Sequence, residues 1–345
     1  MTAARHVGRV ATCSPLSGLT FSAMEQFKEN INLSGITNYR IGGPATFFFE
    51  AKSPKEVLWA VNAAKERKTD FFVLGAGTNI LAPDEGFAGL VLRPKIDFIE
   101  IDGDFLRAGA GALVSDVLQA AAKAGLSGLE WAGGLPGTFG GAIRGNAGAF
   151  KGEIKDVVHD VESFNTKTFA FITRTNAECA FSYRSSIFKE KGDEIILSAR
   201  LLLAKGDPKK IAKAIAEKIA YRMNRHPMEY PNVGSIFKNV PLARIYAEGT
   251  PNYADAVRNS LLHFRGSSVP VKIDPFPVVP TAYLISESGL KGVSFGGAMV
   301  SPKHPNFIVN VLDAKASDIK TLISLVKTGV AEKFAVDLEE EVHIL

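Results

Sequence analysis

Ser235 lies in the stretch "NVGSIFKN", where a hydroxyl stands between a glycine and an isoleucine and is followed by Lys238 and Asn239. No Gly-x-Ser-x-Gly motif surrounds this serine, so the usual activated nucleophile is excluded. Judged by residue type alone, a serine after a glycine is more typical of a turn or a cap. Any chemistry at Ser235 must therefore depend on groups elsewhere in the chain.

Glycine-rich segments could offer backbone N–H groups to an anion. "GAGTN" lacks the third glycine of G-x-G-x-x-G, and "GGLPGTFGGA" lacks the Lys-Ser or Lys-Thr ending of a P-loop. These two segments could equally be structural turns. "NYRIGGPA" adds a glycine pair beside Arg40, which could neutralise a pyrophosphate, although a lone arginine is more often a surface ion-pair partner. Three such turns together favour a large phosphorylated cofactor.

The composition is that of a globular protein with two or three domains: 345 residues, 46% hydrophobic and 22% charged. The formal net charge of +4 comes from dispersed residues, which suits a small anionic ligand better than nucleic acid. No window reaches the roughly 18 to 20 apolar residues of a membrane helix. Cys13 and Cys179 have neither disulfide nor metal spacing, so we expect no metal site and a reducing cytoplasm.

Residues 1–23 contain basic residues but no apolar core of signal-peptide quality. They are expected to be a disordered tail, or an upstream extension if translation starts at Met24. We assign residues 1–35 to a partly disordered N-terminal extension.

The glycine segments are framed by strand and helix patterns. Residues 46–50 predict a strand, and Ser53, Pro54 and Glu56 predict a capped helix after it. The order strand, helix, strand, glycine turn predicts a ligand held by backbone at the end of the second strand. Gly133 to Phe150 contains seven glycines and predicts a loop.

The remaining segments predict further regular elements. A helix after Leu113 could be capped by Ser115 or Asp116, and residues 156–204 are rich in strand patterns. The basic helix "DPKKIAKAIAEKIAYRMNRHP" ends at Pro227, and its charges are expected to form a solvated face. Two more helices follow, the second capped by Ser317, and "EEEVHIL" predicts a terminal strand.

Eight ordered motifs resemble those of the UDP-N-acetylenolpyruvoylglucosamine reductases, the flavoenzymes of peptidoglycan synthesis. They are "YRIGGPA", "LGAGTNIL", "GLPGTFGGAIRGNAGAF", "FSYRSSIFK", "NVGSIFKN", "SGLKG", "GGAMVSPKHPNFIVN" and "LEEEV". The resemblance covers about residues 36–345 and implies an α+β fold. A two-subdomain FAD-binding region of the vanillyl-alcohol oxidase (PCMH) type would occupy 36–206, and an α+β substrate-binding domain 207–345.

The resemblance also implies FAD and NADPH as cofactors. The substrate would be UDP-N-acetylglucosamine enolpyruvate, reduced to UDP-N-acetylmuramate in the cytoplasm, without nucleic-acid partners or membrane insertion. "GAGTN", the first glycine loop, would lie on the FAD pyrophosphate. "GLPGTFGGAIRGNAGA", the second glycine loop, would lie near the isoalloxazine. The implied cofactor-binding residues are Arg40, Gly42, Gly43, Gly75, Ala76, Gly77, Thr78, Asn79, Gly134, Pro136, Gly137, Thr138, Gly140, Gly141, Asn146 and Gly148.

The family's catalytic residues fall on Arg184, Ser235 and Glu341. Hydride transfer to the enolpyruvyl double bond would leave an enolate, which Arg184 and a protonated Glu341 would stabilise. Ser235 would give a proton to the α-carbon. Without the family, Arg184 would be an ordinary exposed charge and Glu341 one acid in a run of three.

The resemblance also implies roles for other residues. Substrate contacts would fall on Tyr183, Lys238, Asn239 and Lys291. His304 and Asn306 lie in a family motif, where a packing role is at least as well supported.

One departure from the family pattern is an insertion at about residues 241–279, after which Thr281 and Ala282 replace Ala-Gly. We expect it to form a helix and a hairpin over the substrate cleft. Only 50 residues separate Arg184 from Ser235, which indicates the shorter subtype without a tyrosine-bearing capping loop. The rival hypotheses are another PCMH-type FAD oxidoreductase, acting on a small hydroxy acid, and a flavin- or sugar-nucleotide-binding protein without catalysis.

Overall fold

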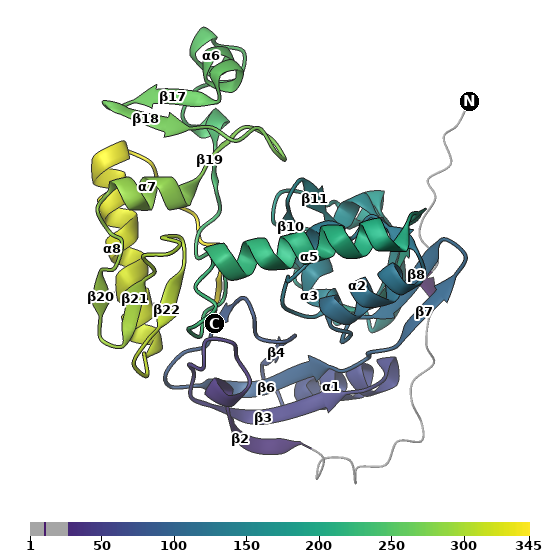
Figure 1. Cartoon of the computed structure of the whole chain (residues 1–345). Coiled ribbons are helices and arrows are strands. Elements are labelled where there is room, and N and C mark those ends of the chain that lie inside the picture. Colours follow the sequence, from purple (N-terminus) through teal and green to yellow (C-terminus); the bar gives the residue numbers. More distant parts are fainter. Residues whose placement is uncertain (1–9, 12–26) are drawn as a thin grey trace, which may run out of the picture. The chain divides into compact units, whose positions relative to one another are not determined.

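The computed structural model describes residues 10–11 and 27–345 (Figure 1). Most of the predicted tail, including Cys13, lies outside the described residues. The chain divides into two compact units, described separately below. The described part of the first unit comprises residues 10–11, 27–31, 45–76 and 87–220, and the second unit comprises residues 32–44, 77–86 and 221–345. The glycine loop 75–79 passes from the first unit to the second after Ala76.

The first unit begins with a sheet of order β2-β3-β6-β4, in which β6 pairs in parallel with β3 and β4. Helix α1 (Pro54–Glu66) buries its apolar side in the same core as these strands. Its predicted cap is confirmed, because Ser53 Oγ accepts from the Glu56 N–H at 3.3 Å. The strands are β2 (Lys28–Asn32), β3 (Pro44–Ala51), β4 (Phe71–Val73) and β6 (Phe87–Pro94).

A second sheet of the first unit has six strands in the order β1-β13-β12-β14-β8-β7, and its pairs are antiparallel. This sheet confirms the strand-rich prediction for 156–204. Its strands are β1 (Val10–Ala11), β7 (Ile99–Asp102), β8 (Phe105–Gly109), β12 (Val158–Asn165), β13 (Ala170–Thr175) and β14 (Glu194–Leu202). The helices are α2 (Val114–Lys123), α3 (Phe139–Arg144), α4 (Ile187–Glu190) and the start of α5 (Pro208–Arg225), and the shorter strands are β9 (Leu126–Ser127), β10 (Gly148–Ala149), β11 (Gly152–Glu153) and β15 (Ala204–Lys205).

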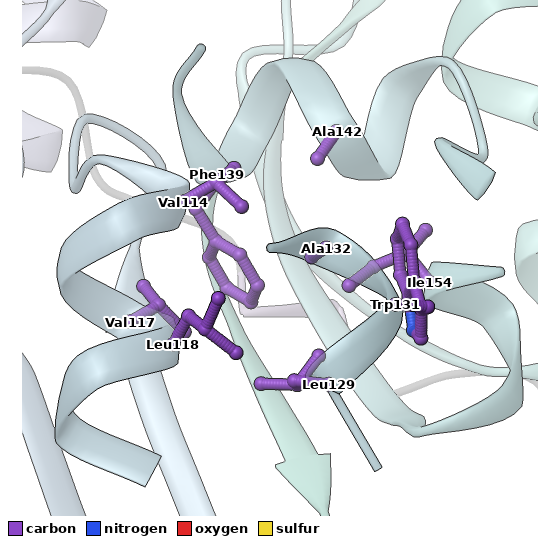
Figure 2. Close-up of a pocket in the computed structure, with 9 residues that line it drawn as sticks. All are labelled: Val114, Val117, Leu118, Leu129, Trp131, Ala132, Phe139, Ala142 and Ile154. Atoms are coloured by element: carbon purple, nitrogen blue, oxygen red, sulfur yellow. The ribbon is translucent and has the colours of Figure 1, made fainter. Parts of the chain in front are cut away.

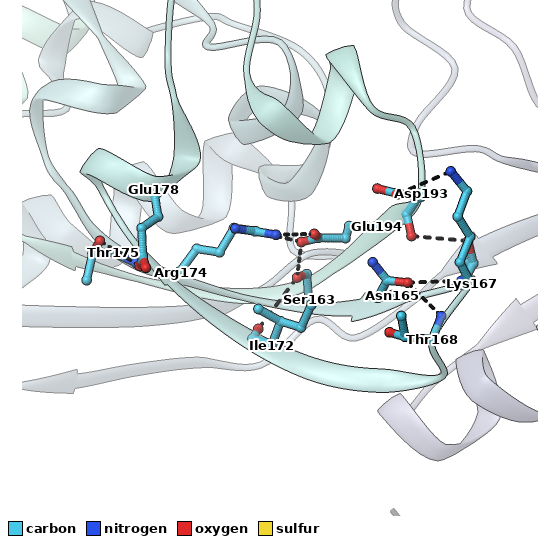
Figure 3. A network of polar contacts seen from close by, with 11 residues as sticks. Ser163, Asn165, Lys167, Thr168, Ile172, Arg174, Thr175, Glu178, Asp193 and Glu194 are labelled. Carbon is cyan, nitrogen blue, oxygen red and sulfur yellow. Dashed lines mark hydrogen bonds and ion pairs between the residues drawn. The ribbon is translucent and has the colours of Figure 1, made fainter. Parts of the chain in front are cut away.

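A buried carboxylate joins three strands of this sheet (Figure 3). Arg174 Nε donates to Glu194 at 2.9 Å, and Ser163 Oγ donates to the same carboxylate at 2.7 Å. Burial alone would raise the pKa of Glu194, but the hydrogen bonds from Arg174 and Ser163 outweigh burial and lower it. The ionised carboxylate therefore holds β12, β13 and β14 in register.

Cys179 is a free thiol buried in the first unit. Burial raises its pKa to about 12, so the thiolate is suppressed and the group is inert.

Two sequence predictions for the first unit are wrong. Neither Ser115 nor Asp116 caps α2: its N-cap is Leu113, and the Val114 N–H donates to Gly137 O at 3.0 Å instead. The glycine-rich segment 133–150 is not only a loop, because it contains α3. That helix forms despite its glycines because Thr138 Oγ1 accepts from the Gly141 N–H at its start.

The second unit packs two helices against short strands. The C-terminal strand is confirmed, because β23 (His343–Ile344) pairs in parallel with β5 (Ile80–Leu81). The other elements are β16 (Val240–Pro241), β19 (Val278–Val279), α7 (Thr281–Glu287), β20 (Ser294–Phe295), β21 (Ala298–Val300), β22 (Ile308–Asn310) and α8 (Ala316–Phe334).

The insertion forms the predicted helix and hairpin. Helix α6 (Pro251–Asn259) precedes β17 (Leu261–Phe264), which pairs with β18 (Ser267–Pro270). Leu262 and Val269 are buried in the core of the second unit. The insertion is thus part of this core.

Ser317 does not cap the last helix, contrary to prediction. Helix α8 begins at Ala316 with Lys315 as its N-cap residue, so Ser317 lies inside its first turn. Asp84 supplies the carboxylate, accepting from the N–H groups of Ala316 at 2.6 Å and Ser317 at 3.1 Å. A loop distant in sequence therefore caps α8.

No helix in the described ranges is long and apolar enough to cross a membrane. The same residues contain no group of three or more His, Cys, Asp or Glu side chains arranged to hold a metal ion.

Two histidines of the second unit are packed with an aromatic ring. The centroids of His226 and His304 are 5.4 Å apart, and each lies within 5.0 Å of Phe307. His304 Nδ1 is buried and has no hydrogen-bond partner among the residues described. Burial lowers the pKa of both histidines to about 4, and for His226 the neighbouring His304 adds to the effect.

This pair should make the protein sensitive to acid. The folded-state pKa lies below the ordinary value of 6.5, so the unfolded chain takes up protons first. The contribution of each histidine to the free energy of unfolding should be fully present above about pH 6.5. It should be lost toward pH 4, where the free energy of unfolding falls by about 2 kcal/mol for each histidine. Urea unfolding of His226→Phe should show a flatter pH dependence than the parent. The exposed His263 is the control: His263→Phe should leave that dependence unchanged, and equal slopes for all three proteins would contradict the assignment.

Candidate active site

The backbone around Ser235 is held from two sides within the second unit. On one side, the Ile236 N–H donates to Asn306 O at 2.8 Å. On the other, the Glu341 N–H donates to Ile236 O at 2.7 Å, and Phe237 forms a bridge with Glu340. The structure therefore brings together the segments that carry Ser235 and Glu341.

The tip of the first glycine loop fastens the Glu341 segment. Asn79 Nδ2 donates to Glu341 O at 3.0 Å, and the His343 N–H donates to Asn79 O at 3.0 Å. The side chain of Asn79, predicted to bind cofactor, is thus engaged with the protein.

Two asparagines connect this loop to residues 232–239, the serine loop that carries Ser235. The Asn38 N–H donates to Gly77 O at 2.9 Å, and Asn38 Nδ2 donates to Asn232 O at 2.7 Å. Asn232 Oδ1 in turn accepts from the Gly234 N–H at 3.1 Å. Gly234 has φ +84°, a conformation that favours glycine. A continuous polar path therefore joins residue 77 to the turn before Ser235.

Arg40 is exposed at the surface of the second unit and also has a positive φ, +56°. It follows Tyr39, which is fully buried and donates its hydroxyl to Ile308 O at 2.8 Å. Burial raises the pKa of Tyr39, so the phenol stays neutral. This anchor fixes the backbone that presents Arg40.

The predicted substrate residues beside Ser235 already have protein partners. Lys238 pairs with Glu339, and Asn239 Oδ1 accepts from the Thr281 N–H at 3.2 Å, at the start of α7. Thr281 Oγ1 donates to Lys238 O at 2.6 Å. The threonine that departs from the family pattern therefore ties α7 to the serine loop. Lys291, by contrast, lies exposed in the turn after α7.

In the first unit, Arg184 lies beside the second glycine loop. Its Nη2 donates to Gly148 O at 2.9 Å, and its guanidinium carbon is 5.2 Å from the centroid of the Tyr183 ring. Asn146 Nδ2 donates to Ser182 O at 2.8 Å, which anchors the turn before Arg184. Tyr183, Arg184, Asn146 and Gly148 are thus brought together, whereas Ser235 and Glu341 belong to the other unit.

The two glycine loops adjoin at Gly75 and Thr138, because a Cβ at position 75 would lie 2.6 Å from Thr138 Oγ1. The start of α3 is occupied by protein: the Phe139 N–H donates to Ala112 O at 2.8 Å, and the Gly140 N–H to Ala110 O at 2.9 Å. The glycine at 140 is explained by packing, since a Cβ there would lie 2.7 Å from the Ala110 Cβ. Gly141 is more open.

Gly42 and Gly43 also serve packing. A Cβ at position 42 would lie 2.6 Å from the Ala82 Cβ, and one at position 43 would lie 2.3 Å from Asp84 O. Glycine is required at both positions because a Cβ would clash with the loop 77–86, whether or not a cofactor is bound.

A small apolar pocket in the first unit contains none of the predicted site residues (Figure 2). The Trp131 ring on its wall has a buried Nε1 without a hydrogen-bond partner in the described ranges. The ring packs so closely on Gly152 that a Cβ there would lie 2.3 Å from Trp131 Cδ1. The pocket lining is Val114, Val117, Leu118, Leu129, Trp131, Ala132, Phe139, Ala142 and Ile154.

The sequence did not predict roles for Asn38 and Asn232 or a positioning role for Asn306. The available signal was local: each asparagine adjoins a turn, in "TNYR", "YPNVG" and "HPNF". Asn38 and Asn306 bond to residues that are distant in sequence, so these hydrogen bonds could not be predicted from the sequence.

Comparison with known proteins assigns both regions. The FAD binding domain family model matches residues 45–167, and the model of the UDP-N-acetylenolpyruvoylglucosamine reductase C-terminal domain matches residues 226–345. The UDP-N-acetylenolpyruvoylglucosamine reductases of Carboxydothermus hydrogenoformans and Latilactobacillus sakei subsp. sakei are 39% and 37% identical, over 92% of this chain and 93% of each of theirs.

A solved structure agrees. The crystal structure of UDP-N-acetylenolpyruvylglucosamine reductase from Thermus caldophilus matches with a TM-score of 0.71 and 30% identity, over 92% of this chain and 99% of that one. These matches confirm the resemblance and the α+β fold with a PCMH-type FAD-binding region. The chain therefore belongs to the UDP-N-acetylenolpyruvoylglucosamine reductase family and is an FAD-dependent oxidoreductase.

Proposed function

We propose that this protein reduces UDP-N-acetylglucosamine enolpyruvate to UDP-N-acetylmuramate with NADPH, as a cytoplasmic step of peptidoglycan synthesis. The observation that carries the proposal is that the serine loop and the Glu341 segment are bonded to each other, at Ile236. An oxidase of small hydroxy acids would not need the segments that carry Ser235 and Glu341 to be bonded, and no observation favours that alternative.

The first glycine loop suits a diphosphate. None of the five backbone N–H groups from Gly75 to Asn79 donates to an acceptor in the described part of the chain. Such unpaired donors are what an anion needs. We assign FAD binding to 36–206 and the substrate to 207–345, with Gly77, Thr78 and Asn79 assisting the FAD region. Gly134, Pro136, Gly137 and Gly141 would line the cofactor with backbone.

Bound FAD would supply the redox chemistry, carrying hydride from NADPH to the substrate. Arg184 would meet the substrate carboxylate as negative charge develops there, because its guanidinium is always protonated and offers a rigid fork of donors. Gly148 O and the Tyr183 ring hold this guanidinium. Such a preorganised donor is typically worth about 3 kcal/mol of transition-state stabilisation.

Glu341, in its protonated form, would donate a second hydrogen bond to the enolate. Its main chain is fixed on both sides, by Ile236 and Asn79. Ser235 would give its hydroxyl proton to the α-carbon, completing the reduction, and regain a proton from water. Lys238 would exchange Glu339 for the substrate diphosphate, with Tyr183, Asn239 and Lys291 as further contacts.

The cofactor assignment predicts a selective effect at Gly77. This glycine has φ +68°, and a Cβ would lie 2.8 Å from Ile36 O, so Gly77→Ala should distort the loop. Purified Gly77→Ala should retain several-fold less FAD, measured as flavin absorbance relative to protein absorbance. Gly103→Ala is the matched control, because Gly103 has φ +60° but open space around it. It should lose about 1 kcal/mol of stability and keep its FAD; equal FAD in both variants would count against the assignment.

The proton-donor assignment predicts a separation of the two half-reactions. Ser235→Ala should leave flavin reduction by NADPH nearly unchanged, because that half needs no proton from the serine. Reoxidation by the enolpyruvyl substrate should slow by about 100-fold or more. Stopped-flow absorbance measures each half separately, and comparable losses in both would refute the role of Ser235.

A further inference from the structure

The side chain of Asn306 forms hydrogen bonds with the main chain of Phe237, two residues after Ser235. Its carboxamide contacts both polar groups of Phe237: Oδ1 accepts from the Phe237 N–H at 3.0 Å, and Nδ2 donates to Phe237 O at 2.8 Å. Its own carbonyl accepts from the Ile236 N–H at 2.8 Å. Asn306 is only 4% exposed and Phe237 only 1%, so water cannot replace these bonds.

Hydrogen bonds, more than packing, must orient the serine turn. Gly234 has nothing within 4 Å of the position that a Cβ would take. The turn is therefore open on that side. The residues after Ser235, in contrast, are buried and doubly bonded. The geometry of the hydroxyl thus follows from how Ile236 and Phe237 are held.

We infer that Asn306 is a positioning residue for Ser235, an inference that rests on the proposed function. A carboxamide of this length offers one acceptor to the N–H and one donor to the C=O of the same residue, Phe237. An ionised aspartate would lose the donor, and an alanine would leave two buried main-chain groups unpaired. Asn306 acts without touching the substrate, through the backbone that carries the proton donor.

The inference makes a kinetic distinction. A proton donor displaced by about 1 Å can cost about 100-fold in rate. Flavin reduction by NADPH involves no proton from Ser235, so it should tolerate the displacement. A residue needed only for folding would affect both half-reactions, or neither, in the molecules that remain folded.

The test uses FAD-loaded Asn306→Ala, with Asn306→Asp as a milder variant that keeps the acceptor for the Phe237 N–H. Asn165→Ala is the control: Asn165 is also buried and accepts two main-chain N–H bonds, but in the β12–β13 hairpin. Stopped-flow should show reoxidation by the enolpyruvyl substrate slowed at least tenfold in Asn306→Ala, with flavin reduction within about twofold of the parent. Asn165→Ala should match the parent in both halves.

A double variant shows whether Asn306 acts through Ser235. In a Ser235→Ala background, Asn306→Ala should slow reoxidation no further. A further slowing equal to that in the parent, a parallel loss in both halves, an unchanged rate, or failure of both Asn306 variants to fold would each overturn the inference. If the parent enzyme itself is not reoxidised by the substrate, the proposed function fails instead.

Discussion

The second unit depends on the last residues of the chain being held by two loops that come from much earlier in the sequence. Strand β23 pairs with β5, and Glu341 is bonded through its main chain to Ile236 and to the side chain of Asn79. Each bond alone is worth about 1 kcal/mol. Together these bonds fix the main-chain segments that carry the Glu341 carboxyl group and the Ser235 hydroxyl group. The same loop caps α8 through Asp84, so moving it would disturb both the helix and the site.

The glycines of this chain do two different jobs. Gly42, Gly43 and Gly140 are required because another part of the chain passes where a Cβ would be. The N–H groups of the loop 75–79 donate to no acceptor among the described residues, which suits an anion. Motif reading treats all of these glycines alike, whereas the N–H groups of Gly43 and Gly140 already donate to Pro83 O and Ala110 O. Gly75 and Gly77 combine both features, because a Cβ would lie 2.6 Å from Thr138 Oγ1 at position 75 and 2.8 Å from Ile36 O at position 77.

Patterns local in sequence were predicted well. The Ser53 cap and the insertion's helix and hairpin depend on neighbours close in sequence. For β14 and β23 the residue pattern predicted a strand, but not the distant partner strands β8 and β5. The two wrong helix caps share one cause, which is competition from distant groups. Asp84 caps α8 in place of Ser317. At the start of α2, Gly137 O accepts from the Val114 N–H, and neither Ser115 nor Asp116 acts as the cap. Asn38, Asn232 and Asn306 could not be assigned partners for the same reason.

The resemblance placed the family's catalytic positions on Arg184, Ser235 and Glu341, but it could not say what holds them. That information lies in main-chain bonds, which residue type does not specify. The structure supplies it for each residue: Gly148 and Tyr183 for Arg184, Asn306 for the serine loop, and Asn79 for the Glu341 segment.

The most direct test of the account is NADPH oxidation by the FAD-loaded protein, followed with and without UDP-N-acetylglucosamine enolpyruvate. The account predicts oxidation that depends on this substrate and yields UDP-N-acetylmuramate in equal amount. Oxidation that is indifferent to the enolpyruvyl compound, in a folded and flavin-loaded sample, would contradict it.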